Sequence, residues 1–166
     1  HGSSYLNTGG CDKFFIITDF EKKPTGIEFS RTVKINNIEQ KYSGFLEYSM
    51  ITPIIKNATK ASSNLLVEEG DCFCFTPVNL LTENAKSYIK WGESMGFNKK
   101  SGVKNKKVWY KPQNDMISGN VLIVPRTFSD RFNIYFNKNN LPSLRYYRIG
   151  LNPNLADAKR YLPFFF

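Results

Sequence analysis

A chain of 166 residues with 41% hydrophobic and 15% aromatic residues is long and apolar enough to fold around a sizeable core, which excludes a disordered protein. Its formal net charge of +9 makes polyanions, namely nucleic acid or an anionic membrane surface, the first partners to consider. No apolar run approaches the roughly 20 residues of a membrane-spanning helix, and no N-terminal stretch has the pattern of a secretory signal, so we expect no membrane partner.

The first half of the chain predicts strands that are separated by turns. The leading His1-Gly2-Ser3-Ser4 looks like a vector-derived remnant, so we place the domain at residues 5–166. Residues 39–50 are ambiguous, and residues 51–57 read as an irregular apolar segment bent at Pro53. Runs rich in β-branched and aromatic residues predict strands at residues 14–18, 31–35 and 71–76, with a turn at residues 23–26.

One helix is well signalled, at about residues 82–96. Thr82 is suited to cap it, Glu83 lies in its first turn, and Gly96 can end it in a left-handed conformation. Gly92 lies on its apolar stripe and lowers helix propensity, which indicates that another element packs closely there. The rest of the chain predicts strands at residues 108–111, 121–124, 132–136 and 146–149, turns at residues 118–120 and 138–140, and a second helix that starts near Asn154.

The order of these elements predicts the fold class. Strands and helices are mixed without a regular βαβ alternation, which favours α+β. We therefore expect a β-rich single domain whose mixed or antiparallel sheet is covered by the helix at about residues 82–96, with a further helix at the C-terminus.

The numbers and positions of cysteine and histidine argue against several kinds of functional site. Cys72 and Cys74 alternate in an apolar run, which favours two core residues on one face of a strand, and Cys11 leaves an odd number of thiols. The only histidine is His1, so neither a zinc site nor a mechanism with a histidine base is expected. This usage is typical of a reduced, cytoplasmic protein.

A lysine-rich run is the most informative stretch of the chain. Six lysines and no acid lie between Phe97 and Lys111, and the run ends in Trp109 and Tyr110, which we expect to alternate on a strand with Trp109 in the core. Lysines at this density repel one another, and they become favourable where phosphates replace their counterions. The alternative is a solvated run of charge. The residues predicted to bind phosphates are Lys99, Lys100, Lys104, Lys106 and Lys107.

Five short motifs follow one another across residues 7–137. They are TGGCDKFFII (8–17), PIIK (53–56), YIKWGESMG (88–96), KVWYK (107–111) and VLIVPRTFSDRFNIYFN (121–137). In order and spacing this succession resembles the target-recognition domain of TaqI-type adenine DNA methyltransferases and of related restriction–modification enzymes. The resemblance departs from the family at Gly10 and Asp12, where many relatives carry asparagine.

The resemblance implies a module that recognises duplex DNA and does not catalyse a reaction. Family members pair such a domain with a methyltransferase domain that holds S-adenosylmethionine. The N-P-P-[YF] motif and the glycine-rich cofactor loop of that catalytic domain do not occur in this sequence. We therefore expect no cofactor in this chain, and we expect its partners to be double-stranded DNA and a methyltransferase catalytic domain or other restriction–modification subunits.

Several residues besides the lysines are candidates for DNA contacts. Thr8 and Gly9 form a tight turn that brings the backbone close to a phosphate, or they serve only as a turn. Arg126 and Arg131 flank a short loop between strands, and arginine is suited to read guanine in the major groove. The residues suited to adenine, or alternatively to hydrogen bonding at the surface, are Asn133, Asn137 and Asn139.

Two other functions remain open at this point. One is an enzyme that cleaves nucleic acid with an unrecognised carboxylate site, for which Glu68, Glu69 and Asp71 are the densest acids, although they read best as a turn between strands. The other is a single-strand or RNA-binding module that uses the interleaved aromatic and basic residues as a stacking platform.

Overall fold

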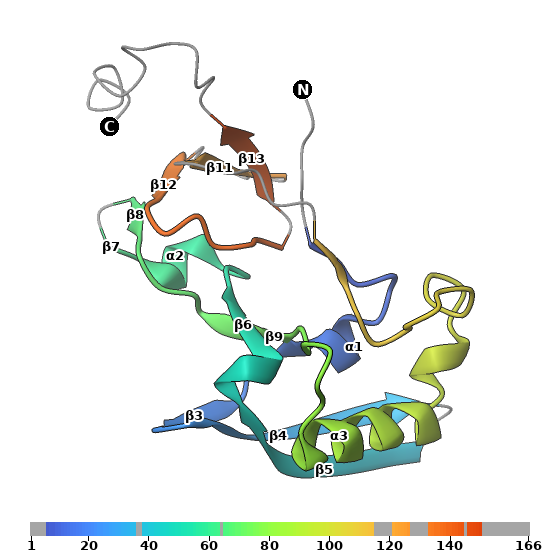
Figure 1. Ribbon diagram of the computed structural model, residues 1–166. Coiled ribbons are helices and arrows are strands. Elements are labelled where there is room, and N and C mark those ends of the chain that lie inside the picture. The colour runs from blue at the N-terminus through green and yellow to red at the C-terminus, as the bar shows by residue number, and fades with distance from the viewer. Residues whose placement is uncertain are drawn as a thin grey trace. The chain divides into compact units, whose positions relative to one another are not determined.

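The computed structural model describes residues 6–35, 38–63, 65–114, 121–126, 133–144 and 146–150 (Figure 1). These residues form an α+β fold, as predicted, and they divide into two compact units. Unit 1 comprises the described parts of His1–Leu6, Ile54–Asp71 and Asn114–Phe166, and unit 2 comprises those of Asn7–Pro53 and Cys72–Gln113. The remnant predicted at residues 1–4, the turn at 118–120 and the helix predicted near Asn154 lie outside the described residues.

An antiparallel three-stranded sheet forms one side of unit 2. Its order is β3 (Phe20–Lys23), β4 (Gly26–Ile35) and β5 (Ile38–Glu47), and Lys23 pairs with Gly26 across the turn that the sequence predicts. The strand predicted at residues 31–35 is thus the end of a ten-residue strand. The ambiguous stretch at residues 39–50 is mostly β5, and it ends in the 3-10 helix η1 (Tyr48–Met50).

A second sheet of unit 2 has the order β2 (Ile16–Ile17), β9 (Cys72–Phe75) and β6 (Ile51–Ile54). The strand predicted at residues 71–76 is confirmed, with both of its cysteines buried. The segment at residues 51–57 is more regular than predicted, because its first four residues are strand β6.

The strand predicted at residues 14–18 is wrong in its first half. Asp12–Phe15 form the one-turn helix α1, and the chain becomes strand only at Ile16. Phe14 and Phe15 are consecutive and both fully buried, which a half-buried strand cannot achieve because its side chains alternate between two faces. One helical turn, and not a strand, directs both of these consecutive aromatic side chains into the core.

Helix α3 (Glu83–Ser94) lies where the sequence predicts it and packs on β5 (Figure 1). The Thr82 hydroxyl accepts a hydrogen bond from the Ala85 N–H at 3.2 Å, and Gly96 follows the helix with φ of 73°. A Cβ on Gly92 would meet the Phe14 ring and would lie 2.9 Å from Trp109. The close packing predicted at Gly92 is confirmed.

Phe14 and Tyr88 form the centre of an aromatic core in unit 2. Their rings stack at 4.8 Å between centroids, and Trp109 contacts Phe14 at 4.7 Å. The Tyr88 hydroxyl donates to the Phe14 carbonyl at 2.6 Å and accepts a bond from the Arg31 guanidinium at 2.6 Å. Arg31 also donates to the carbonyls of Lys13, Phe14 and Ile16, so one side chain joins β4 to the segment that contains α1.

The strand predicted at residues 108–111 is wrong, because this segment consists of a turn at residues 109–110 between two bends. Trp109 and Tyr110 therefore do not alternate on a strand. Trp109 is half-buried: one face of its ring packs on Phe14, and its Nε1 donates to Glu93 Oε1 at 3.1 Å. The chain becomes strand only afterwards, in β10 (Gln113–Asn114), which pairs with β1 (Leu6–Asn7).

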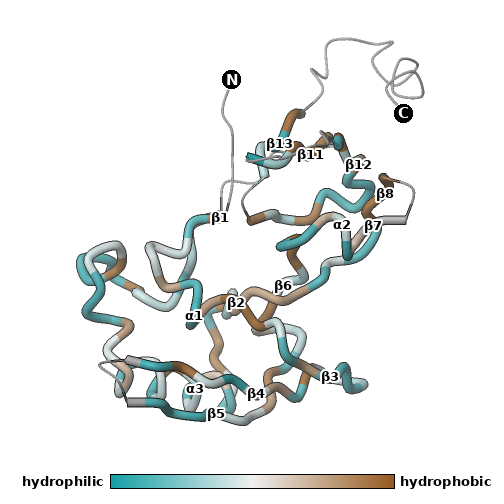
Figure 2. Tube along the Cα trace, turned by 180° about the vertical axis from the view of Figure 1, so that it is seen from behind, coloured by the Kyte–Doolittle hydropathy of each residue, from teal (hydrophilic) through white to brown (hydrophobic). Residues whose placement is uncertain are grey.

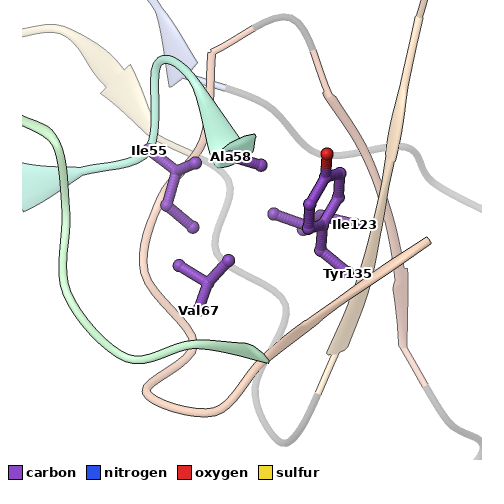
Figure 3. Close-up of a cluster of buried hydrophobic side chains, with 5 residues drawn as sticks. All are labelled: Ile55, Ala58, Val67, Ile123 and Tyr135. Carbon is purple, nitrogen blue, oxygen red and sulfur yellow. The ribbon is translucent and has the colours of Figure 1, made fainter. Parts of the chain in front are cut away.

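Unit 1 contains a five-stranded mixed sheet and the short helix α2 (Ala58–Ala61). Its core is a cluster of fully or almost fully buried side chains: Ile55, Ala58, Val67, Ile123 and Tyr135 (Figure 3). The predictions of strands at residues 121–124 and 146–149 are confirmed, whereas the strand predicted at 132–136 begins at Tyr135 within the described residues. The order of the sheet is β13 (Tyr146–Gly150), β11 (Val121–Pro125), β12 (Tyr135–Asn137), β8 (Leu66–Val67) and β7 (Ser62–Ser63).

Candidate nucleic-acid interface

The lysine-rich run of unit 2 is folded into consecutive turns, and we call residues 97–107 the lysine loop. It starts with the 3-10 helix η2 (Phe97–Lys99) directly after Gly96. Main-chain hydrogen bonds then join Val103 N–H to the Lys100 carbonyl at 3.0 Å and Lys106 N–H to the Val103 carbonyl at 2.9 Å. Phe97 and Val103 are buried, so the loop is anchored by apolar side chains at both ends of its lysine pair 99–100.

The lysine loop lies against the glycine turn near the N-terminus, about 90 residues earlier in the sequence (Figure 2). A Cβ on Gly9 would lie 2.7 Å from the Gly102 carbonyl oxygen and 2.8 Å from the Val103 side chain. The Lys100 ammonium donates to the Gly10 carbonyl at 3.4 Å. The structure therefore brings together two motifs that the sequence analysis singled out separately.

Both glycines of this turn have backbone reasons to be glycine. Gly9 has φ of 60° and Gly10 has φ of 79°, a region that other residues rarely adopt. Gly9 also contacts the main chain of Gly102, whereas a Cβ on Gly10 would meet nothing. The main chain of Gly9 closely approaches another part of this chain, at Gly102, and its contact with a phosphate stays a prediction.

Most lysines of the lysine loop are exposed, and within the described residues none of them forms an ion pair. Lys99, Lys100, Lys104 and Lys107 are exposed, and Lys106 is half-buried. Within the part of the chain that the structure describes, the ion pairs involve other lysines: Lys23, Lys86 and Lys138. The loop thus places five ammonium groups, without carboxylate partners, within a stretch of nine residues.

The positive charge of the lysine loop affects the pKa of the nearby Cys11 thiol. Burial raises the pKa of the Cys11 thiol above its ordinary value, while the positive charges of Lys100 and Lys106 act in the opposite direction. The Cys11 thiol also points to the carbonyl of Phe97, at 3.7 Å. Cys11 is fully buried, so its role here is to pack the glycine turn against the loop.

Thr8 holds the glycine turn in place. It is 95% buried, its hydroxyl donates to the Asp12 carboxylate, and its carbonyl accepts from the Cys11 N–H at 3.1 Å. The Gly9 N–H donates to the Asn7 side chain at 2.9 Å. Of the two sequence alternatives for Thr8 and Gly9, a phosphate contact or a turn, these bonds favour the turn.

The other candidate residues lie in unit 1. Arg126 is exposed directly after β11, with its guanidinium 5.4 Å from the centre of the Tyr147 ring. Asn133 donates to the Tyr135 hydroxyl at 3.4 Å, and Asn139 donates to the Glu68 carbonyl at 2.7 Å. Arg131 lies outside the described residues. The candidates are thus divided between the units, with the lysines in one and the arginine and asparagines in the other.

Asn137 is unsuited to the base contact that the sequence analysis considered. It is fully buried, its amide nitrogen donates to the Leu141 carbonyl at 2.8 Å, and its amide oxygen accepts from the Leu141 N–H at 3.0 Å. Both ends of the amide therefore close the turn after β12.

The acidic residues around Gly70 are used in structural contacts. They lie between strands β8 and β9, as predicted. The Asp71 carboxylate accepts from the N–H groups of Lys56 and Asn57 at 2.6 and 3.0 Å, and Glu68 forms an ion pair with Lys138 at 2.5 Å. Among the described residues, no three histidine, cysteine or acidic side chains are grouped so that they could hold a metal ion.

Sequence reasoning missed the anchor of the lysine loop. Val103 is almost completely buried in the middle of a basic run, and Gly102 provides the close approach to Gly9. A signal was present, because Val103 is the one large apolar residue between Phe97 and Val108. A lone apolar residue among lysines indicates a loop that is attached to a core.

The comparisons with known proteins do not identify a family for this chain. Searches of protein families, of curated proteins and of solved structures give no match to this chain. None of the helices in the described ranges is long and apolar enough to cross a membrane.

Proposed function

We propose that the chain is a sequence-specific duplex DNA recognition module of a restriction–modification methyltransferase. It would supply the choice of target, while a partner domain holds S-adenosylmethionine and transfers the methyl group. The observation that carries this proposal is the lysine loop, in which five ammonium groups without carboxylate partners are held on an ordered backbone. The order of the sequence motifs supports the restriction–modification context.

Phosphates are the ligand that the chemistry of this loop fits best. Lysine acts as a point charge with rotatable donors, so it fixes the register of a protein on DNA without reading bases. Because the main chain of the loop is already hydrogen-bonded, binding costs mainly the freedom of the side chains. We infer that the loop supplies backbone affinity and that sequence choice comes from other residues, with Arg126, Arg131, Asn133 and Asn139 as candidates.

The partners and the location follow from the same proposal. A recognition module acts on duplex DNA beside a methyltransferase catalytic domain or other restriction–modification subunits, and we infer a cytoplasmic location. The three cysteines are buried and form no disulfide bond, which suits a reducing compartment.

The test is the salt dependence of duplex DNA binding by the full chain. For about five neutralised phosphates, a plot of log affinity against log salt concentration should have a slope of about −4 to −5. The triple variant K99A/K104A/K107A removes three exposed charges and should make the slope shallower by about 2 to 3 units. The charge-matched control K34A/K41A/K60A removes three exposed lysines elsewhere, and its slope should stay close to that of the unaltered chain.

Two results would contradict the proposal. If the loop variant and the control change the slope equally, binding depends on net charge and not on the lysine loop. If single-stranded DNA or RNA binds more tightly than the duplex at every salt concentration, the chain belongs to the single-strand class. Divalent-metal-dependent cleavage of DNA by the purified chain would instead favour the nuclease alternative.

A further inference from the structure

The turn that follows β12 in unit 1 has an unusually well-bonded backbone, and we call residues 137–141 the asparagine turn. The Asn137 amide bonds to the main chain of Leu141 at both of its ends. The Asn140 N–H donates to the Asn137 carbonyl at 3.2 Å, and Asn140 has a left-handed conformation with φ of 53°. Asparagine is one of the few residues other than glycine that adopt this conformation readily. The turn therefore has one well-defined backbone geometry.

A buried arginine supports the asparagine turn. Arg148 on β13 is 3% exposed, and its guanidinium donates to the Asn140 carbonyl at 3.3 Å and to the side-chain oxygen of Asn140. Its Nε has no hydrogen-bond partner, and among the described residues no carboxylate forms an ion pair with it. A buried charge without an opposite charge is unfavourable, and unfavourable local arrangements are concentrated at functional sites. Because the hydrogen bonds of Arg148 go to Asn140, the burial of this charge serves to fix the turn.

Two exposed side chains, those of Lys138 and Asn139, form the tip of the asparagine turn. The Lys138 N–H donates to the Val67 carbonyl at 3.0 Å, which attaches the tip to the neighbouring strand β8 (Figure 1). The Lys138 ammonium forms an ion pair with Glu68 at 2.5 Å. This pair offsets a carboxylate that would otherwise repel the phosphates of a nucleic acid.

The amide of Asn139 is held in one orientation. Its nitrogen donates to the main-chain carbonyl of Glu68 at 2.7 Å. A carbonyl only accepts hydrogen bonds, so this contact fixes which end of the amide is the nitrogen. Within the described ranges the amide oxygen has no partner, and the nitrogen carries a second hydrogen besides the one that Glu68 accepts. Asn139 therefore offers one acceptor and one donor from a fixed position on the surface.

We propose that Arg148 is a positioning residue for DNA recognition and that it holds Asn139 in the pose in which its amide reads an adenine in the major groove. The inference rests on the proposed function and assigns one of the base contacts that this function requires. Adenine presents the N7 acceptor and the N6 amine in the major groove, and an asparagine amide pairs with both. Because the turn is fixed before DNA binds, this contact costs little backbone freedom.

The test of Asn139 is the base preference of the full chain in a library of duplexes with randomised base pairs, from which the bound duplexes are sequenced. We expect one position at which adenine is enriched at least about fivefold. Asn139→Ala should abolish this enrichment and leave the preferences at other positions as they were. The matched control Lys138→Ala changes the adjacent residue, and it should weaken binding to all duplexes alike while the adenine preference stays. If Asn139→Ala keeps the full adenine preference, the proposal is wrong.

The positioning role is tested with Arg148→Lys, which keeps the charge but not the fixed fork of donors. The variant should lower the adenine preference at the Asn139 position severalfold and leave the other positions unchanged. Combined with Asn139→Ala it should have no further effect at that position, because both substitutions act on one contact. A purely structural role would lower the preferences at all positions or at none, and either result would overturn the proposal.

Asn140→Gly provides the same test if Arg148→Lys does not fold. Glycine adopts a φ of 53° without strain, so this substitution removes the side-chain acceptor of Arg148 and leaves the backbone conformation accessible. It should also lower the adenine preference, and an unchanged preference would contradict the role of Arg148. Failure of the proposed function has a different signature, because the unaltered chain would then bind no duplex or enrich no sequence, which would refute both proposals. A selective chain whose Asn139→Ala variant keeps its adenine preference would refute only the roles of Asn139 and Arg148.

Discussion

Replacing Gly102 with alanine tests the contact that positions the lysine loop. The new Cβ would meet the Gly9 carbonyl and would lie 2.7 Å from Gly9 Cα, so main-chain atoms on one side of the contact must move. Overpacking of this kind costs about 1–3 kcal/mol. The loss of conformational freedom in the unfolded chain returns about 0.4–1 kcal/mol. We therefore expect G102A to lower the free energy of unfolding by about 1–2 kcal/mol.

The assay is urea unfolding followed by tryptophan fluorescence. Both tryptophans, Trp91 and Trp109, belong to unit 2, so their emission reports the unit that contains the loop. With a slope of about 2 kcal/mol per molar urea, the midpoint should fall by roughly 0.5–1 M. Ser101 is the exposed neighbour, and S101A should change the free energy of unfolding by less than about 0.5 kcal/mol.

A second readout of G102A connects stability with function. The variant keeps every charge, so any loss of DNA affinity under conditions where it is folded reports the placement of the lysines. We expect weaker binding to all duplexes. An unfolding midpoint equal to that of S101A would refute the close contact between Gly102 and Gly9. Reduced stability with unchanged DNA affinity would instead separate this contact from the interface.

Three further predictions concern unit 2. Arg31→Lys should lower the free energy of unfolding, measured in urea, by about 2–4 kcal/mol, because one ammonium cannot replace a guanidinium that donates to three carbonyls and to the Tyr88 hydroxyl. A loss below about 0.5 kcal/mol would contradict these bonds. Burial raises the pKa of Tyr88, so the folded state holds this proton more tightly than the unfolded state; stability is complete below the unfolded pKa of about 10 and falls above it, and Tyr88→Phe should lessen that alkaline loss. Thr82→Ala should lower the free energy of unfolding by about 1–2 kcal/mol, because it removes the helix cap and the hydroxyl that donates to Glu47 at 2.7 Å. Urea unfolding followed by the helical circular dichroism signal measures this loss.

The elements that the sequence predicted well are those whose signals are local. Thr82 and Gly96 act at the two ends of helix α3, and both have the roles that their residue types indicate. The strands at β9, β11 and β13 were likewise recognisable from short runs of β-branched and aromatic residues. Local propensity and tertiary packing agree in these segments, so the sequence alone suffices.

The elements that the sequence predicted poorly are those decided by packing. Phe14 and Phe15 have strand propensity, but both enter the core only because one helical turn directs them there. Trp109 was placed on a strand, yet its ring is positioned by contacts with Phe14 and with Glu93 of another element. The pairing of Gly9 with Gly102 joins positions 93 residues apart, and no local pattern encodes such a contact.

The order of the lysine loop bears on the division of labour within the proposed interface. A basic tail without structure would lose backbone freedom on every duplex that it binds, whereas this loop is already fixed by Val103 and by its own turns. Its lysines therefore contribute affinity that depends on salt and hardly on sequence. Selectivity then requires side chains held in fixed poses at base edges, which arginine provides and lysine does not. It follows that lysine substitutions should lower specific and non-specific affinity together, and that a change in their ratio should come from arginine positions such as Arg126.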